Sequence, residues 1–178
     1  MKKFVIAFCI LVYSFGNSQE KKTLNFKQNE LKLDVTYLIF AGALNASYEH
    51  LVNDESGLGV GLVLSSGNEI NTTFSLSPYY RFYFGSKPAA GFFFEGFTML
   101  STFKAEKRTP YGYYYSYETS NVTDLAIGIG LGGKWITRNG ILFEINTGVG
   151  RNLLNDYSNY TSGYKIVGKF GLSVGYRF

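Results

Sequence analysis

The segment FGLSVGYRF, residues 170–178, closes the chain with a strict two-residue alternation of side chains. Bulky apolar residues occupy every second position, small or charged residues lie between them, and the last residue, Phe178, belongs to the bulky set. Successive side chains of a β-strand point to opposite faces, so this repeat predicts a strand. Chain ends are commonly polar and poorly ordered, and an alternating aromatic end therefore indicates a strand that forms part of the fold.

The same alternation recurs along the chain and predicts an all-β protein of eight strands. We expect strands at the following ranges: 31–40, 44–51, 58–65, 73–84, 91–104, 125–135, 141–150 and 166–178. Seven of them have a readable phase. The strand at 91–104 does not, because an inward Glu95 would also bring Phe93, Phe97 and Met99 inward unless a bulge intervenes.

The two faces of these strands differ in side-chain size, as LAIGIGLGGKW (125–135) shows. One face carries Leu, Ile and Trp, and the other carries Ala, Gly and Lys134. An eight-stranded barrel has a narrow interior, which the many Phe and Tyr residues of the bulky face would overfill. Rows of glycine would weaken strands on a water-exposed surface. We therefore expect the bulky side chains outside, facing lipid, rather than inside as in a soluble lipocalin-like barrel.

The expected connections differ in length between the two rims. Those at 53–57, at 85–90 and around Asn139-Gly140 are short, and Asn-Gly is a strong signal for a two-residue hairpin. Those at 105–120 and 152–163 are long and belong to the opposite rim. Antiparallel strands in even number, with short turns on one rim and longer loops on the other, are typical of outer-membrane barrels, in which closure satisfies every backbone group.

These features resemble those of Gram-negative outer-membrane β-barrel proteins, whose last strand ends in an aromatic residue after alternating apolar positions. The matching positions form the expected C-terminal assembly signal: Phe170, Leu172, Val174, Tyr176 and Phe178. The resemblance covers 31–178 and is to small eight-stranded barrels of the OmpX, OmpW and OmpA-membrane-domain kind. SPYYRFYF (77–84) and GLGGKW (130–135) are also similar to small barrels whose functions are not characterised. The resemblance implies insertion by the barrel-assembly machinery, periplasmic N- and C-termini, and contact with outer-membrane lipid and lipopolysaccharide.

The first 18 residues have the organisation of a secretory signal peptide. Residues 1–3 are positive overall, 4–15 are apolar, and small residues lead up to an expected cleavage site after Ser18. The apolar run is too short to span a bilayer as an anchor. We expect 19–30 to be a polar periplasmic lead-in and 31–178 to form the barrel domain.

Composition excludes several classes of function. The single cysteine, Cys9, lies inside the apolar run, so the mature chain would have no thiol for disulfides, thiolate zinc sites or a cysteine nucleophile. Loss of Lys2 and Lys3 lowers the basic residues from 17 to 15, against 13 acidic residues, and leaves a net charge of +2. We expect no nucleic-acid partner, because such partners require a strongly basic surface.

The alternation places charged side chains in the expected interior. The predicted lumen charge network comprises Asp34, Glu49, Arg81, Glu95, Lys134, Glu144, Lys169 and Arg177. Lys32 and Lys165 share the inward phase. Isolated charges are costly in a narrow, poorly hydrated space, so we interpret the set as a salt-bridge network that fills the lumen. The alternative is a charge-selective conduit, which requires a continuous water path that eight strands seldom leave.

His50 is the sole histidine, and a serine–histidine mechanism would require it beside a nucleophile. The chain direction places it at the periplasmic rim on the lipid-facing side, whereas lipid A chemistry is expected at the opposite rim. We therefore interpret His50 as a polar interfacial residue. One histidine and no mature cysteine leave no transition-metal cluster, and we expect no catalytic residue, metal or cofactor.

The connection AEKRTPYGYYYSYETSN (105–121) combines cations with tyrosines and, by strand parity, faces the outside of the cell. Its candidate surface-contact residues are Arg108, Tyr111, Tyr113, Tyr114, Tyr115 and Tyr117. Amphipathic rings beside cations suit contact with glycans, lipopolysaccharide or protein. Alternatively, the segment extends the flanking strands as a hairpin whose tyrosines pack on one another. The second long loop, 155–164, has a similar composition and is a candidate to pack against the first.

The sequence thus predicts an integral outer-membrane β-barrel without enzymatic activity, with a structural or surface-interaction role through its Tyr-rich loop. The alternative is a narrow channel for small or hydrophobic solutes, of the OmpW-like kind. A third interpretation is a lipid A-modifying enzyme.

Overall fold

The computed structural model describes residues 26–65, 70–111, 114–157, 160 and 165–178. The expected signal peptide and residues 19–25 of the expected lead-in lie outside this part of the chain. The elements, in chain order, are β1 (Asn29–Asp34), α2 (Val35–Phe40), β2 (Ala43–Asn53), β3 (Ser56–Ser65), β4 (Thr72–Tyr83), β5 (Gly91–Tyr111), β6 (Tyr114–Ile136), β7 (Ile141–Asn152) and β8 (Ile166–Arg177). Within the described residues, no helix is long and apolar enough to cross a membrane.

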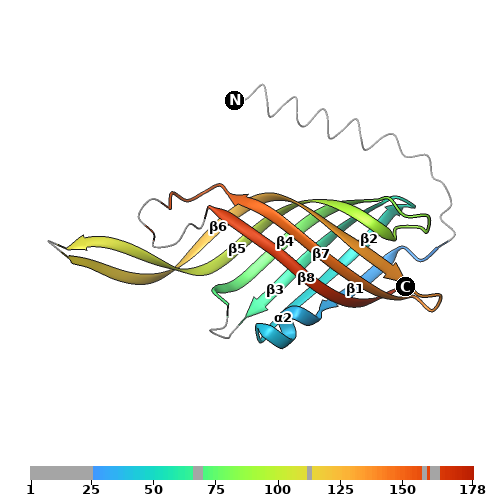
Figure 1. Cartoon of the computed structure of the whole chain (residues 1–178), viewed down its shortest axis with the longest axis horizontal. Helices are drawn as coiled ribbons and strands as arrows, with labels where there is room; N and C mark the ends of the chain where they lie inside the picture. Colours follow the sequence, from blue (N-terminus) through green and yellow to red (C-terminus); the bar gives the residue numbers. More distant parts are fainter. Residues whose placement is uncertain (1–25, 66–69, 112–113, 158–159, 161–164) are drawn as a thin grey trace, which may run out of the picture.

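The eight strands form a closed barrel in chain order, with every neighbouring pair antiparallel (Figure 1). Closure is made by β1 and β8, and Asn29 and Phe178 exchange backbone hydrogen bonds of 3.1 and 2.8 Å where the ladder ends. We call this rim the terminal end. The long β5–β6 hairpin projects from the opposite rim, which we call the hairpin end (Figure 1). The prediction of an eight-stranded antiparallel barrel is confirmed.

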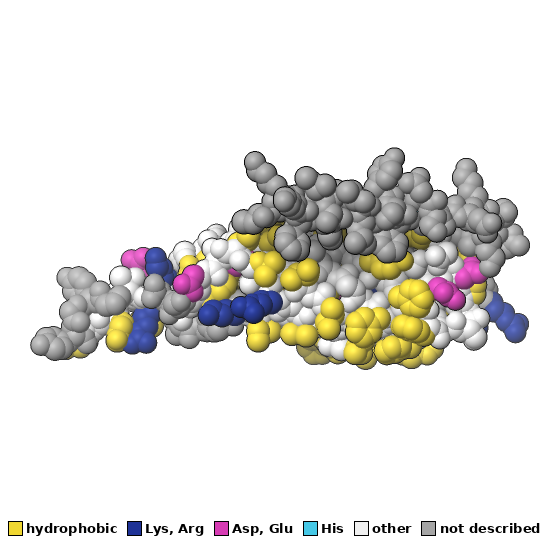
Figure 2. Space-filling view, turned by 90° about the horizontal axis from the view of Figure 1, so that it is seen from above, with side chains coloured by type: hydrophobic (Ala, Val, Ile, Leu, Met, Phe, Trp, Pro, Cys, Tyr) yellow, Lys and Arg dark blue, Asp and Glu magenta, His cyan; other side chains and the backbone are white. Residues whose placement is uncertain are grey.

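The bulky face of the strands lies outside, as expected. On β6, Ile127, Ile129 and Leu131 are 44–57% exposed, whereas Ala126 and Lys134 on the opposite face are at most 1% exposed. Figure 2 shows hydrophobic side chains gathered over the middle of the barrel wall, with charged side chains toward its two ends. The period of two therefore sorts the chain into an apolar exterior and a small or charged interior.

Large rings also enter the interior where glycines face them. The buried rings are those of Tyr79, Tyr83, Phe93 and Phe97. A Cβ atom at Gly59 would overlap the ring of Tyr79, and one at Gly128 would overlap the ring of Phe97 and the backbone of β7. The phase of 91–104 is thus inward at Phe93, Glu95 and Phe97, and the β5 register needs no bulge there.

The expected strand at 31–40 is wrong in its second half, because β1 ends at Asp34 and α2 follows. The Asp34 carboxylate accepts hydrogen bonds from the backbone N–H groups of Thr36 (2.9 Å) and Tyr37 (3.2 Å), which caps the helix start. Gly42, with φ of +54°, reverses the chain into β2. Local capping therefore overrides the β-branched and aromatic composition of this segment.

The interpretation of 105–121 as a hairpin that extends the flanking strands is confirmed. β5 and β6 stay paired in one register from Gly91↔Lys134 to Tyr111↔Tyr114. Their neighbours stop earlier, since the last β4 pair is Thr72↔Phe103 and the last β7 pair is Ala126↔Asn152. The outer part of this hairpin is consequently a two-stranded ribbon beyond the barrel (Figure 1).

The terminal end has an apolar floor inside the barrel. Leu51, Tyr83, Ala89 and Phe93 form a buried cluster, and Phe26 packs against it. The β4–β5 connection is tied across this end, because Ala89 N–H donates to the Asp54 carbonyl at 2.6 Å. The side chain of Arg177 also donates to the carbonyls of Pro88 and Ala89, at 2.8 Å each.

Candidate functional site

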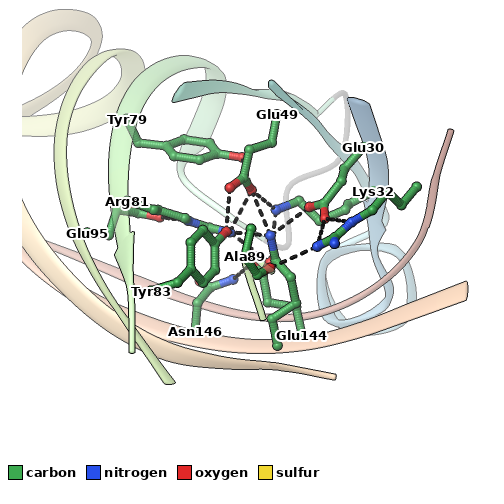
Figure 3. Close-up of polar contacts among 12 residues, drawn as sticks. Glu30, Lys32, Glu49, Tyr79, Arg81, Tyr83, Ala89, Glu95, Glu144 and Asn146 are labelled. Carbon is green, nitrogen blue, oxygen red and sulfur yellow. Dashed lines mark hydrogen bonds and ion pairs between the residues drawn. The ribbon is translucent and has the colours of Figure 1, made fainter. Parts of the chain in front are cut away.

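A network of buried ion pairs lies above this floor, and Glu49 on β2 is at its centre (Figure 3). One oxygen of Glu49, Oε2, accepts from Lys32 at 2.7 Å, from Arg81 at 3.1 Å and from Lys134 at 3.2 Å. The other oxygen, Oε1, accepts from the hydroxyl of Tyr83, which also contacts Lys134 Nζ. Side chains from three other strands, β1, β4 and β6, therefore meet at this carboxylate.

Three further carboxylates complete the network, and each is held by two cations. Glu144 on β7 pairs with Lys32 at 2.8 Å and with Arg81 at 2.7 Å. Glu95 on β5 pairs with Arg81 at 2.7 Å and with Lys169. Glu30 on β1 pairs with Lys134 at 2.6 Å and with Arg177 at 2.6 Å.

The network is nearly balanced in charge and is dry. It contains four carboxylates and five cations, and all of these side chains are buried except that of Lys169, which is 20% exposed. The guanidinium of Arg81 also lies between two rings, 4.4 Å from the centroid of Tyr79 and 4.2 Å from that of Phe93. A carboxylate held in this way by two or three cations is an acceptor within the structure rather than a free general base.

The structure brings together all but one of the predicted network residues. The exception is Asp34, which faces the interior at the end of β1 but caps α2 and accepts from the amide of Asn45 at 3.2 Å. Among the ion pairs of the described residues, Asp34 has none. Lys165, which shares the inward phase, lies before β8 and is exposed.

Three members of the network were not predicted: Glu30, Tyr79 and Tyr83. Glu30 belongs to the expected lead-in, although it is two residues before Lys32 and lies in β1. Extending the alternation by one repeat would have included it. The two tyrosines share the inward phase with Arg81, but no sequence signal shows that their hydroxyls reach Glu49.

A small polar cavity lies on the hairpin side of the network. Its volume is about 50 Å³, and it is lined by residues that include Asp34, Tyr37, Ser77, Asn146 and Lys169. Such a volume holds a few water molecules. Together with the floor at the terminal end, the network and this cavity favour a filled lumen over a conduit.

The candidate contact surface lies on the projecting hairpin. The guanidinium of Arg108 lies 3.4 Å from the ring centroid of Tyr115, and Tyr117 is the register partner of Arg108 on the same face. Both rings are at least half exposed, and Tyr114, on the opposite face, is 79% exposed. The side chain of Tyr111 and the whole of Tyr113 lie outside what the structure describes. Arg108 and two rings therefore form one exposed cation–aromatic platform.

The β7–β8 connection packs on the base of the hairpin, as its composition suggested. Tyr157 and Tyr160 pack on Phe103, Ala105 and Val122, which line the inner face of the hairpin. The ring centroids of Phe103 and Tyr157 are 6.5 Å apart in a stacked arrangement. A second apolar cluster thus joins the β7–β8 connection to the base of the hairpin.

Asp124 on β6 holds this connection in place and was not predicted. Its carboxylate accepts hydrogen bonds from the backbone N–H groups of Leu153 (3.2 Å), Leu154 (2.9 Å) and Asn155 (3.2 Å), and from the hydroxyl of Tyr157. Burial and the adjacent Asp124 carboxylate raise the pKa of the Tyr157 hydroxyl above its ordinary value.

The C-terminal positions and His50 lie on the exterior. The five positions of the expected C-terminal signal are 40–49% exposed: Phe170, Leu172, Val174, Tyr176 and Phe178. His50 is exposed at the terminal end, and its Nδ1 lies 3.0 Å from the side-chain oxygen of Asn29. Tyr48 donates to the same oxygen at 2.7 Å, so His50 belongs to a polar cluster at the rim.

The fold is similar to a solved bacterial barrel. The crystal structure of the N-terminal β-barrel domain of Pseudomonas aeruginosa OprF matches with a TM-score of 0.52 and 15% sequence identity. The match covers 86% of this chain and 98% of that chain, so the two share the whole barrel. No family model and no curated protein sequence matches the chain.

Proposed function

We propose that this protein is an integral outer-membrane barrel with a closed lumen, without enzymatic activity, which presents the β5–β6 hairpin outside the cell. The observation that carries the proposal is the position of the apolar side chains. Leucine, isoleucine and aromatic residues are exposed on every strand of the wall, whereas the charged residues of the ion-pair network are buried inside, apart from the partly exposed Lys169. In water this arrangement would expose a large apolar surface, but in a bilayer it matches hydrocarbon outside and polar groups inside.

The orientation follows from the two rims. The terminal end carries short turns, which suit the periplasm, and the hairpin end carries the longer connections, which suit the cell exterior. The alternating aromatic positions of β8 agree with a C-terminal signal for the barrel-assembly machinery. Lipid and lipopolysaccharide would then be the direct neighbours of the wall.

The platform on the hairpin supports a surface-interaction role. Arg108 supplies a fixed positive charge, and Tyr115 and Tyr117 supply exposed rings. A cation beside rings is suited to anionic glycans, in which the charge pairs with carboxylate or phosphate and the rings contact sugar faces. A rigid ribbon would hold these groups away from the membrane.

The test compares the full chain with the triple variant Arg108→Gln, Tyr115→Thr, Tyr117→Thr. Threonine suits a strand, so the hairpin is retained while the platform is lost. We expect wild-type protein on cells to bind carboxylated and phosphorylated glycans on an array, and the triple variant to lose that binding. Deletion of 108–119 should likewise abolish binding and leave the barrel folded.

The matched control is Lys104→Gln, which removes a cation from the same hairpin outside the platform. Its binding should stay close to that of wild type. Unchanged binding in the triple variant would refute the role of the platform, and a wild-type chain that stays soluble without detergent would refute the membrane location.

A further inference from the structure

The outer half of β6 has a neighbouring strand on one side only. Beyond the last β7 pair, Ala126↔Asn152, β6 continues to Tyr114 and stays paired with β5 alone. All residues from Tyr114 to Asn121 are exposed. Among the described residues, none forms a backbone hydrogen bond with the other edge of 114–121. This stretch is therefore an open sheet edge that projects beyond the barrel (Figure 1).

The backbone groups on this edge take their direction from the last contacts at its base. The carbonyl of Leu125 accepts from the N–H of Leu153 at 3.0 Å, and the carbonyl of Thr123 accepts from the side chain of Asn155 at 2.8 Å. Backbone groups alternate between the two edges of an antiparallel strand, so every second residue continues this direction. The residues whose N–H and C=O groups point to the open edge are therefore Tyr115, Tyr117, Thr119 and Asn121.

The corresponding edge of β5 is protected. On the side away from β6, Lys107 forms an antiparallel bridge with Tyr160 of the β7–β8 connection, and the surrounding segment AEKR (105–108) is mostly charged. Cover and charge are features that keep an edge strand from pairing with another chain. The β6 stretch 114–121 has one charged residue, Glu118, and contains neither proline nor glycine. The hairpin thus has one protected edge and one edge suited to pairing.

We propose that this edge pairs with the same edge of a second copy of the chain, as two antiparallel β6 strands. A two-fold axis at Tyr117 places it opposite the partner's Tyr117, and Tyr115 lies opposite the partner's Thr119. Each of these pairs exchanges two N–H···O bonds. Glu118 then lies opposite the partner's Ser116, so like charges do not face each other, and the two Tyr117 rings form an aromatic cross-strand pair.

The position of the axis follows from the charge on β6 and from its covered base. An axis at Glu118 would oppose two carboxylates, which is destabilising. An axis at Thr119 would bring the partner's Tyr115 against Thr123, whose carbonyl already accepts from Asn155. The axis at Tyr117 avoids both conflicts.

This pairing fits copies that lie in facing membranes. The two β6 strands run in opposite directions, whereas all barrels in one membrane project their hairpins to the same side. The inference therefore rests on the proposed membrane location, with the hairpin outside the cell. The strand from the axis to the last β7 pair is about 30 Å long, so the two walls would be about 60 Å apart. The hairpin would then join one cell to another that carries the same protein.

The first experiment measures dimerisation of the full-length protein in detergent micelles by sedimentation velocity. Tyr117→Pro removes an N–H group from the open edge and leaves the β5 ladder intact, because that group points away from β5. Tyr117→Thr is the matched control, since it loses the same ring and keeps the N–H group. We expect Tyr117→Pro to weaken dimerisation about thirtyfold and Tyr117→Thr by less than about fivefold. Equal dimerisation by Tyr117→Pro and wild type would overturn the edge.

A cysteine pair tests the register. Hydrogen-bonded antiparallel partners have Cα atoms about 5.5 Å apart, a separation that a disulfide can span. Mild oxidation of Tyr117→Cys should therefore give a covalent dimer, whereas Glu118→Cys should stay monomeric. Equal cross-linking of the two variants would overturn the axis at Tyr117. Folding of every variant is scored by the mobility difference between boiled and unboiled samples.

The second experiment mixes two fluorescently labelled strains, one that expresses the protein and one that does not. We expect clusters made of expressing cells alone, and dispersed cells when the expressed variant is Tyr117→Pro. Clusters that include the other strain would overturn a second copy as the partner. Dimers in micelles without clusters of cells would overturn pairing between membranes. The glycan platform is tested separately, because Tyr117→Thr alters the platform and keeps the edge.

Discussion

At the scale of single residues, the interior depends on carboxylates that several cations share. Glu49 faces Lys32, Arg81 and Lys134 within 3.2 Å. These cations cannot turn to solvent, because they are buried among rings and the neighbouring strands. Removal of one acid therefore leaves uncompensated charge in a dry space, which costs more than the ion pair itself contributes.

We expect Glu49→Gln to lower the free energy of unfolding by about 3–5 kcal/mol, the cost of breaking a buried ion pair. The measurement is urea unfolding of protein inserted into vesicles. Glu118→Gln is the control, since Glu118 is exposed on the hairpin opposite Lys107 and its loss should change the value by less than about 0.5 kcal/mol. Equal unfolding curves for the two variants would contradict this account of the network.

Residue parity predicted which charges face inward, but not how they pair. The inward phase of Arg81 and Glu144 is visible in the alternation, whereas their 2.7 Å contact joins β4 to β7 across the barrel. That contact depends on strand tilt and register, which no local pattern specifies. The separate role of Asp34 was not predicted either, because a helix cap can be recognised only when the helix, α2, is known.

At the scale of elements, the β7–β8 connection is fixed by one acid rather than by a ladder. Asp124 accepts from three successive backbone N–H groups, and Tyr157 packs its ring on Phe103. The composition of 155–164 indicated packing on the hairpin, but Asp124 lies just before the expected strand at 125–135 and no local pattern marked it. Its role arises from the path of the loop, which alternation does not encode.

Asp124→Asn should release this connection without opening the barrel. A neutral amide is a weaker acceptor, so protection at Leu153, Leu154 and Asn155 should fall by about 1–3 kcal/mol in amide hydrogen exchange. Amides of Phe143 to Ile145 within β7 are the internal control and should keep their protection. Loss of protection in both places would show that Asp124 supports the wall itself.

The Tyr157 hydroxyl should support the connection up to mildly alkaline pH. Its pKa is raised in the folded chain, so its contribution is fully present below the unfolded value of about 10 and is lost as the pH rises through the folded value. After correction for intrinsic rates, exchange at Leu154 should be constant from pH 7 to about 9.5. Tyr157→Phe should raise the exchange rate at Leu154 at every pH in this range. An increase in the exchange rate above pH 8 in the wild-type protein alone would contradict the raised pKa of Tyr157.

At the scale of the whole molecule, the barrel is filled from the terminal end by an apolar floor around Phe93 and then by the ion-pair network. The Tyr157 cluster packs on the base of the projecting hairpin. The fold class, the strand count and the outward face were all predictable, because a period of two and a narrow interior allow few other solutions. The extended hairpin was one of two interpretations of 105–121, because a strand that leaves the barrel keeps the same local pattern as a loop rich in tyrosine.

A filled barrel should carry no current. We expect purified protein in planar bilayers to give no discrete conductance steps, because the buried ion pairs and the apolar floor fill the lumen and the cavity beside them is only about 50 Å³. An established porin under the same conditions is the positive control. Regular steps from the wild-type protein would show that the network moves aside, and would favour the solute-channel interpretation.

The brevity of β1 has a mechanical consequence. Its ladder with β8 runs only from Glu30 to Asp34, while β5 and β6 are joined from Gly91 to Tyr111. The ladder of β1 with β2 is equally short, from Asn29 to Leu33, so we expect the wall to open first along one of the two edges of β1. Because the β1–β8 pair closes the barrel, we also expect β1 to be the last strand to complete its pairing as the chain assembles.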